Sequence, residues 1–204
     1  MTSVSSSEAA AHPADPAHPA HPAHRVLRAE PLAGRLDLLA EPVAIALAPG
    51  GGAAAVAGTV RVFAIDPELA DTAALCAAFD LPLDTAANCV IVAGTRAGVT
   101  RYAACVALAT TRVDVNGLVR RRLDARRASF APMDDAVRRS GMEYGGINPI
   151  GLPAEWALWI DTAVAATPEV IIGSGVRHSK LLLPGAALGR LPGAEVVTDL
   201  ARPV

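Results

Sequence analysis

The chain has almost no lysine, few aromatic residues and little net charge. Lys180 is its single lysine among 204 residues, arginine supplies the other basic side chains, and aromatic residues make up 3%. A formal net charge of −2 excludes a basic field over the whole molecule. Apolar residues, many of them alanine and valine, make up 52% of the chain. We therefore expect a large core built from small aliphatic side chains.

The cysteines show no disulfide pattern. Cys76, Cys89 and Cys105 have neither CxxC spacing nor the even number of a disulfide framework. We expect buried thiols in a reducing cytoplasm, with the Cys89 thiol packed inward. No apolar run reaches the ~20 residues that a membrane span needs, and the N-terminus lacks the features of a secretory signal. The sequence predicts a cytoplasmic protein without a membrane partner.

Residues 1–24 differ in composition from the rest of the chain. They hold an imperfect Pro-Ala-His repeat and four of the five histidines. Prolines at this density favour an extended, solvated chain, so we expect a disordered Pro/Ala/His-rich tail. A weak metal-binding tract is the alternative to this low-complexity tail. Residues 25–204 are then a single domain.

Strand and helix signals alternate irregularly along that domain. Alternating or β-branched runs predict strands at residues 60–65, 89–93, 101–108, 157–160, 170–172, 180–183 and 194–197. Capping residues and helical spacing predict helices at residues 71–79, 114–125, 132–140 and 184–191. Residues 95–98 form the turn of an antiparallel hairpin. This order predicts an α/β fold of the α+β type with a mixed, largely antiparallel sheet. Neither a G-x-G-x-x-G motif nor a P-loop is present, which argues against nucleotide-binding folds.

The most distinctive segment is residues 141–151, Gly-Met-Glu-Tyr-Gly-Gly-Ile-Asn-Pro-Ile-Gly, with four glycines and a proline. A second glycine turn, Gly173-Ser174-Gly175, follows a short apolar run. Glycine lets a backbone approach a ligand closely, and such loops bind substrates more often than they pack cores. We expect the two bends to face each other across a cavity, with main-chain donors on both walls.

Four blocks of the sequence resemble the YbaK/EbsC family of aminoacyl-tRNA editing domains, which is related to the insertion domain of bacterial prolyl-tRNA synthetases. The blocks are residues 113–118, 128–131, 141–151 and 171–177, and they fit the family over residues 71–200. The resemblance implies a barrel-like sheet with flanking helices and a pocket between them. It also implies hydrolysis of the ester that joins a wrong amino acid to the 3′ end of a tRNA. The implied partners are an aminoacylated tRNA and an aminoacyl-tRNA synthetase; no DNA partner is expected.

The resemblance also assigns roles to individual residues. In the family's Gly-x-x-x-Pro loop the catalytic candidates are Gly145, Gly146, Asn148 and Pro149. The substrate-binding candidates are Asn88, Ser129, Ile147, Gly173, Ser174, Gly175 and Arg177. Structural alternatives exist for some of these residues: Gly145 and Gly146 as turn residues, Asn148 as a side-chain cap and Arg177 as a solvated side chain. Many active members carry a lysine where this chain has Asn88, which donates hydrogen bonds but carries no charge.

Ester hydrolysis of this kind needs little side-chain chemistry. It needs a positioned water, a polarised carbonyl and donors for the tetrahedral oxyanion, and backbone N–H groups of a glycine turn can be those donors. The vicinal ribose hydroxyl can help to activate the water. No Ser-His-Asp set or zinc cluster is visible, and His178 is the only histidine beyond residue 24. We expect no metal and no cofactor.

Two alternatives stay open on the sequence alone. The Asn88 departure also fits a non-catalytic module that binds an aminoacyl group or tRNA as an accessory to a synthetase. An arginine cluster either contacts tRNA phosphates or forms a solvated helix face; its members are Arg120, Arg121, Arg122, Arg126 and Arg127.

Overall fold

The structure is a computed structural model that describes residues 27–204. The tail predicted for residues 1–24 therefore lies outside the described residues. The helices are α1 (Glu41–Leu47), α2 (Ala54–Ala57), α3 (Thr72–Phe79), α4 (Arg120–Arg122), α5 (Met133–Ser140), α6 (Thr162–Ala166) and α7 (Gly185–Leu188). The strands are β1 (Glu30–Pro31), β2 (Arg61–Ala64), β3 (Ala87–Arg96), β4 (Val99–Leu108), β5 (Thr111–Val113), β6 (Arg127–Phe130), β7 (Ala157–Asp161), β8 (Val170–Gly173), β9 (Ser179–Leu183), β10 (Ala194–Val197) and β11 (Ala201–Pro203).

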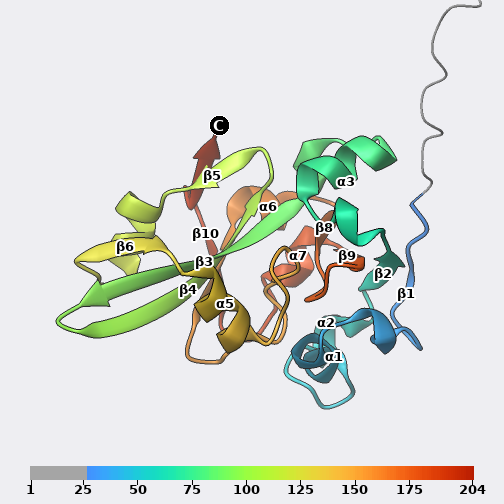
Figure 1. The fold of residues 1–204 in the computed structure, drawn as a ribbon, viewed down its shortest axis with the longest axis horizontal. Coiled ribbons are helices and arrows are strands. Elements are labelled where there is room, and N and C mark those ends of the chain that lie inside the picture. Colours follow the sequence, from blue (N-terminus) through green and yellow to red (C-terminus); the bar gives the residue numbers. More distant parts are fainter. Residues whose placement is uncertain (1–26) are drawn as a thin grey trace, which may run out of the picture.

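The strands form three open sheets. One has the order β1-β2-β9-β8, a second β10-β7-β4-β3-β6, and a third pairs β11 with β5. A single bridge between Ala86 and Ile171 connects the start of β3 to β8. Within residues 27–204 the parallel ladders are those of β7 with β4 and β10, so the predicted mixed, largely antiparallel α+β fold is confirmed. The described strands curve around a core without closing into a barrel (Figure 1).

The long hairpin β3–β4 is the centre of the five-stranded sheet. Its turn is Ala97-Gly98, with φ of 50° and 79°, the backbone of a two-residue type I′ turn that matches strand twist. Successive β4 residues point to opposite faces. Ala104 and Val106 pack into the core shared with the helices, whereas Cys105 packs into a second core on the other face. The predicted hairpin is therefore confirmed.

Capping residues set the start of one predicted helix and the end of another. The Asp71 carboxylate accepts hydrogen bonds from Ala73 N and Ala74 N at the start of α3. Helix α5 ends at Gly141, which has φ of 67°, and glycine adopts this left-handed conformation without a Cβ penalty.

Two other predicted helices are shorter than expected. The helix predicted over residues 114–125 is a π-helical turn, Val115–Val119, followed by the single turn α4. The Asp114 carboxylate caps Gly117 N and Leu118 N, and Asp124 ends the helical segment with φ of 49°. The helix predicted over residues 184–191 is α7 alone and stops before Gly189.

The N-terminal third of the described chain completes the four-stranded sheet. Strand β2 pairs antiparallel with β9, with Phe63 opposite Lys180. Helix α1, which the sequence patterns did not indicate, buries Val43 and Leu47 in the main core. Residues 30–64 are therefore an integral part of the domain.

Candidate active site

A pocket of about 590 Å³ lies where the two larger sheets meet. Its walls come from the start of α3, the first half of β3, strands β8 and β9, helix α5 and the glycine loop, by which we mean residues 141–151. The bridge between Ala86 and Ile171 forms part of the floor. The pocket therefore depends on long-range packing between segments that are distant in the sequence.

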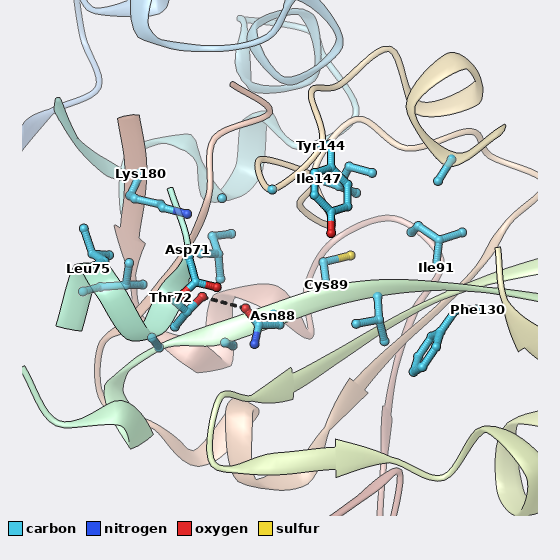
Figure 2. A pocket seen from close by; sticks show the side chains of 18 of the residues that line it. Asp71, Thr72, Leu75, Asn88, Cys89, Ile91, Phe130, Tyr144, Ile147 and Lys180 are labelled. Carbon is cyan, nitrogen blue, oxygen red and sulfur yellow. Dashed lines mark hydrogen bonds between the residues drawn. The ribbon is translucent and has the colours of Figure 1, made fainter. Parts of the chain in front are cut away.

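One part of this pocket is exposed and apolar, and another is buried. Phe130, Met133 and Tyr144 line it with exposed fractions of 58%, 53% and 62%. Leu75 and Lys180 also line it, yet they are 1% and 4% exposed. Figure 2 shows Lys180 and Leu75 on the opposite side of the pocket from Phe130. The pocket thus has an apolar rim and a buried end that contains an ammonium group.

The two glycine bends touch each other directly. Gly175 N donates to Gly146 O at 2.8 Å, and Glu143 N donates to Gly175 O at 2.8 Å. A Cβ atom on Gly173 would lie 2.2 Å from Gly146 O, closer than any side-chain carbon can approach. The prediction that the bends face each other across a cavity is therefore wrong, because they stack backbone on backbone and form one wall.

The N-terminal segment supports this wall from outside. Ala40 N donates to Ser174 O at 3.2 Å, and a Cβ atom on Gly175 would lie 2.4 Å from the Cβ of Ala40. A Cβ atom on Gly151 would lie 2.3 Å from Pro42 O. These glycines therefore permit close packing of chain segments, a role that the sequence did not indicate.

Four of the predicted site residues line the pocket: Asn88, Gly145, Ile147 and Gly173. The Thr72 hydroxyl donates to Asn88 Oδ1 at 2.7 Å (Figure 2). This bond fixes the orientation of the amide, since the carbonyl end accepts from Thr72. Asn88 accordingly offers the pocket a neutral donor.

The other predicted site residues do not line this pocket, and several of them form hydrogen bonds within the protein. Asn148 is fully buried, and its Oδ1 accepts from Ile150 N at 2.8 Å, so it caps its own turn. The Ser174 hydroxyl lies 2.7 Å from the Ser179 hydroxyl in the interior. Gly146 and Gly175 form the bond between the two bends, and Pro149 contributes to a separate apolar pocket beside α1.

Arg177 and Ser129 lie further out. Both polar parts of Arg177 bond within the protein. Its backbone N donates to Glu143 Oε2 at 2.7 Å, and its guanidinium donates to Pro67 O at 3.0 Å. Arg177 therefore fastens the glycine loop to the segment before α3. Ser129 is exposed on β6 and lines a neighbouring groove.

The sequence that forms this fold and pocket matches a known protein family. The family model of the aminoacyl-tRNA editing domain matches residues 66–191, a span that includes every pocket-lining residue. The chain belongs to the aminoacyl-tRNA editing domain family. The resemblance to the YbaK/EbsC editing domains is thereby confirmed.

Solved structures share the fold of this editing domain. A crystal structure described as hypothetical protein APE2540 has a TM-score of 0.62 at 22% identity, covering 71% of this chain and 92% of its own. A proposed trans-editing enzyme for prolyl tRNA synthetase has a TM-score of 0.64 at 18% identity, covering 78% of this chain and 94% of its own. At these identities the similarity establishes the fold. No curated protein matches the chain.

Lys180 is a charged pocket residue that the sequence patterns did not reveal. Its Nζ donates to Ala70 O at 2.7 Å. Burial lowers its pKa from the ordinary value to about 8, against the opposing effect of the nearby Asp71 carboxylate. The available signal was a lone lysine at the start of an apolar strand, Ser-Lys-Leu-Leu-Leu, in a chain that otherwise uses arginine.

Cys89 also lines the pocket of the editing domain, and Figure 2 shows its sulfur within it. Burial raises the pKa of this thiol well above its ordinary value. A thiol with a raised pKa stays protonated at neutral pH and is a poor nucleophile. The pocket therefore does not present Cys89 as a thiolate.

A second groove of about 820 Å³ adjoins the pocket along β6. Arg120, Arg126 and Arg127 line it together with Ser129. The arginine cluster does not lie on one helix face, because α4 is a single turn and Arg127 begins β6. Strand β6 carries Arg127 at the groove and Phe130 at the pocket rim.

The described residues contain neither a metal-binding cluster nor a membrane-spanning helix. Among residues 27–204 no group of three or more His, Cys, Asp or Glu residues could hold a metal ion. His178 is exposed and does not line the pocket. No helix within those residues is long and apolar enough to cross a membrane.

Proposed function

We propose that this editing domain hydrolyses the ester between a wrong amino acid and the 3′-terminal ribose of a tRNA. One observation carries the proposal: the family's glycine loop lines a pocket with an exposed apolar rim and a buried polar end. Its volume of about 590 Å³ lies in the range of roughly 300–1,000 Å³ of small-molecule sites.

The two parts of the pocket suit the two parts of an aminoacyl-adenosine. Bases of single-stranded nucleic acids stack on aromatic side chains, and Phe130 and Tyr144 offer such surfaces at the rim. Small apolar walls of the buried end, among them Ala86 and Ala87, leave room for a small amino-acid side chain. The ester then lies between the rim and the buried end.

The main chain of the glycine loop supplies hydrogen-bond donors for this ester. Gly146 N donates within its turn to Glu143 O. In the described part of the chain, the N–H groups of Gly145 and Ile147, both pocket residues, have no protein acceptor. Such donors stabilise negative charge on a carbonyl oxygen during acyl transfer.

The proton transfers of the reaction use only water and substrate groups. The oxygen of a water molecule attacks the carbonyl carbon, with the vicinal ribose hydroxyl assisting removal of its proton. The bond from the carbonyl carbon to the ribose oxygen then breaks, and the ribose oxygen takes up a proton. The products are the free amino acid and an intact tRNA.

A deacylation panel tests the proposed function. We expect the purified protein to hydrolyse at least one mischarged tRNA carrying Ala, Ser or Cys well above the spontaneous rate, as measured by loss of radiolabelled aminoacyl-tRNA. Correctly charged tRNAs of the same isoacceptors serve as controls. Hydrolysis at the spontaneous rate for every member of the panel would refute the deacylase proposal.

The groove beside β6 is our proposed contact surface for the acceptor end of the tRNA. Arg126 and Arg127 are exposed and line this groove, about three residues from the rim residue Phe130. Contacts to phosphates raise affinity for all sequences and make binding depend on salt. A tRNA held there would direct its 3′ end along β6 toward the pocket.

Reversing these two charges should weaken tRNA binding. For Arg126→Glu with Arg127→Glu we expect KM to rise at least about tenfold with kcat little changed, and the salt dependence of binding to fall by about one unit of slope per arginine. Steady-state deacylation kinetics measure KM and kcat, and filter binding between low and moderate salt measures the salt dependence. Arg190→Glu, an exposed change two residues after α7, is the matched control, and equal effects from both variants would contradict the assignment.

The second candidate is a module that binds aminoacyl groups without turnover. It is favoured by one observation: the pocket holds no activated side-chain nucleophile, since Cys89 has a raised pKa and the Asp71 carboxylate caps α3. This candidate predicts saturable binding of a mischarged tRNA that stays charged. The deacylation panel distinguishes the two functions.

A further inference from the structure

Strand pairing places Lys180 next to the glycine loop. Gly173 on β8 is directly opposite Lys180 on β9, and directly paired residues project from the same face of a sheet. The Cβ direction of Gly173 points at Gly146 O, which is 2.2 Å from an ideal Cβ position. The Lys180 side chain therefore leaves the sheet on the face that the glycine loop covers.

The ammonium group of Lys180 sits in an unusual environment. It is buried, and Ala70 O at 2.7 Å is its one hydrogen-bond acceptor among the described residues. An ammonium group has three donors, and burying it costs free energy that a single carbonyl offsets only in part. Figure 2 shows the group inside the pocket beside the Asp71 side chain. Two donors are thus available to a ligand.

We propose that Lys180 donates a hydrogen bond to the carbonyl oxygen of the bound aminoacyl ester and stabilises the oxyanion that forms there. This assignment rests on the proposed deacylase function. The Lys180 ammonium acts together with the N–H groups of the glycine loop, and it supplies the positive charge that Asn88 lacks. It keeps all three of its protons throughout, so the attack of water and the release of the ribose oxygen proceed as described above.

Removing the ammonium group should abolish most of the rate without unfolding the protein. For Lys180→Met we expect kcat/KM to fall about 100-fold, the typical cost of losing one oxyanion donor. Replacing a buried charge by an apolar side chain of similar size is often neutral for folding, so circular dichroism and cooperative melting should be retained. Arg190→Met, which removes an exposed charge, should keep the wild-type rate. A Lys180→Met protein that keeps kcat/KM within about threefold of wild type overturns the proposal.

A binding experiment separates this assignment from the deacylase proposal. Because Lys180 is the only lysine, protein labelled with ε-15N-lysine gives one side-chain ammonium resonance. The probe is a 3′-amino-3′-deoxyadenosine carrying an amide-linked alanine, which keeps the carbonyl oxygen but cannot be hydrolysed as an ester. We expect saturable binding that shifts this resonance, whether or not any tRNA is deacylated. Absence of binding, or binding that leaves the Lys180 resonance unchanged, overturns the proposal independently of the folding of any variant.

Discussion

Gly173→Ala is expected to lower both stability and deacylation. The single added methyl group would lie 2.2 Å from Gly146 O and 2.8 Å from the carbonyl carbon of the same residue. Both atoms belong to the backbone and cannot rotate away, so β8 and the glycine loop must separate. Overpacking of this kind costs about 1–3 kcal/mol of unfolding free energy. A shift of roughly 1 Å in groups that position a substrate can cost about 100-fold in rate.

Chemical denaturation and the tRNA deacylation assay measure the two effects on one preparation. Gly58→Ala is the matched control, because the same methyl group would meet no atom within 4 Å and the backbone there has φ of −65°. We expect Gly58→Ala to retain wild-type stability and rate. Wild-type rate in a folded Gly173→Ala protein would show that the contact between the two bends does not position the glycine loop.

The sequence located the glycine bends but could not show how they meet. Glycine at 145, 146, 173 and 175 is equally consistent with a bend that holds a ligand and with one that admits a neighbouring backbone. Contacts between residues far apart in the chain decide which of these two roles the glycines have. The hydrogen bond from Gly175 N to Gly146 O is one such contact. Local patterns carry no information on these contacts.

Charge in the pocket was harder to predict than the fold. A cap such as Asp71 or a turn residue such as Gly98 determines the backbone of residues close to it in the sequence. Helix α3 and the β3–β4 hairpin could therefore be predicted from local sequence patterns. Lys180 acquires its position from the pairing of β9 with β2 and β8. The resemblance directed attention to Asn88 on β3, while the cation of the pocket comes from another strand of another sheet.

Helix α1 illustrates a third kind of limit. Its sequence, Glu-Pro-Val-Ala-Ile-Ala-Leu, has no side-chain cap, and its apolar residues follow no clear period. Val43 is nevertheless fully buried, because the helix packs on the two glycine bends. Tertiary packing, and not intrinsic propensity, accounts for most helical stability in proteins.

Deacylation is expected to decline as the pH rises above about 8. Burial lowers the pKa of Lys180 to about 8. The charges of Asp71 and Cys76 oppose this shift, and the charge of Arg177 adds to it. The ammonium form, which binds the carbonyl oxygen, therefore predominates at pH 7, is about half populated at pH 8 and is lost as the pH rises further. The pH dependence of kcat/KM reports groups of the free enzyme, so kcat/KM should fall about tenfold per pH unit and about 100-fold by pH 10.

Lys180→Arg provides the control for this pH profile, since a guanidinium stays protonated throughout the range. Its bulk should reduce the rate at pH 7, but the decline above pH 8 should disappear. The α-amino group of the substrate and the spontaneous hydrolysis of the ester change with pH equally for both proteins, so the ratio of the two rates isolates Lys180. A ratio that stays constant between pH 7 and pH 10 would show that the charge of Lys180 takes no part in the reaction, and the oxyanion would then be held by the glycine loop alone.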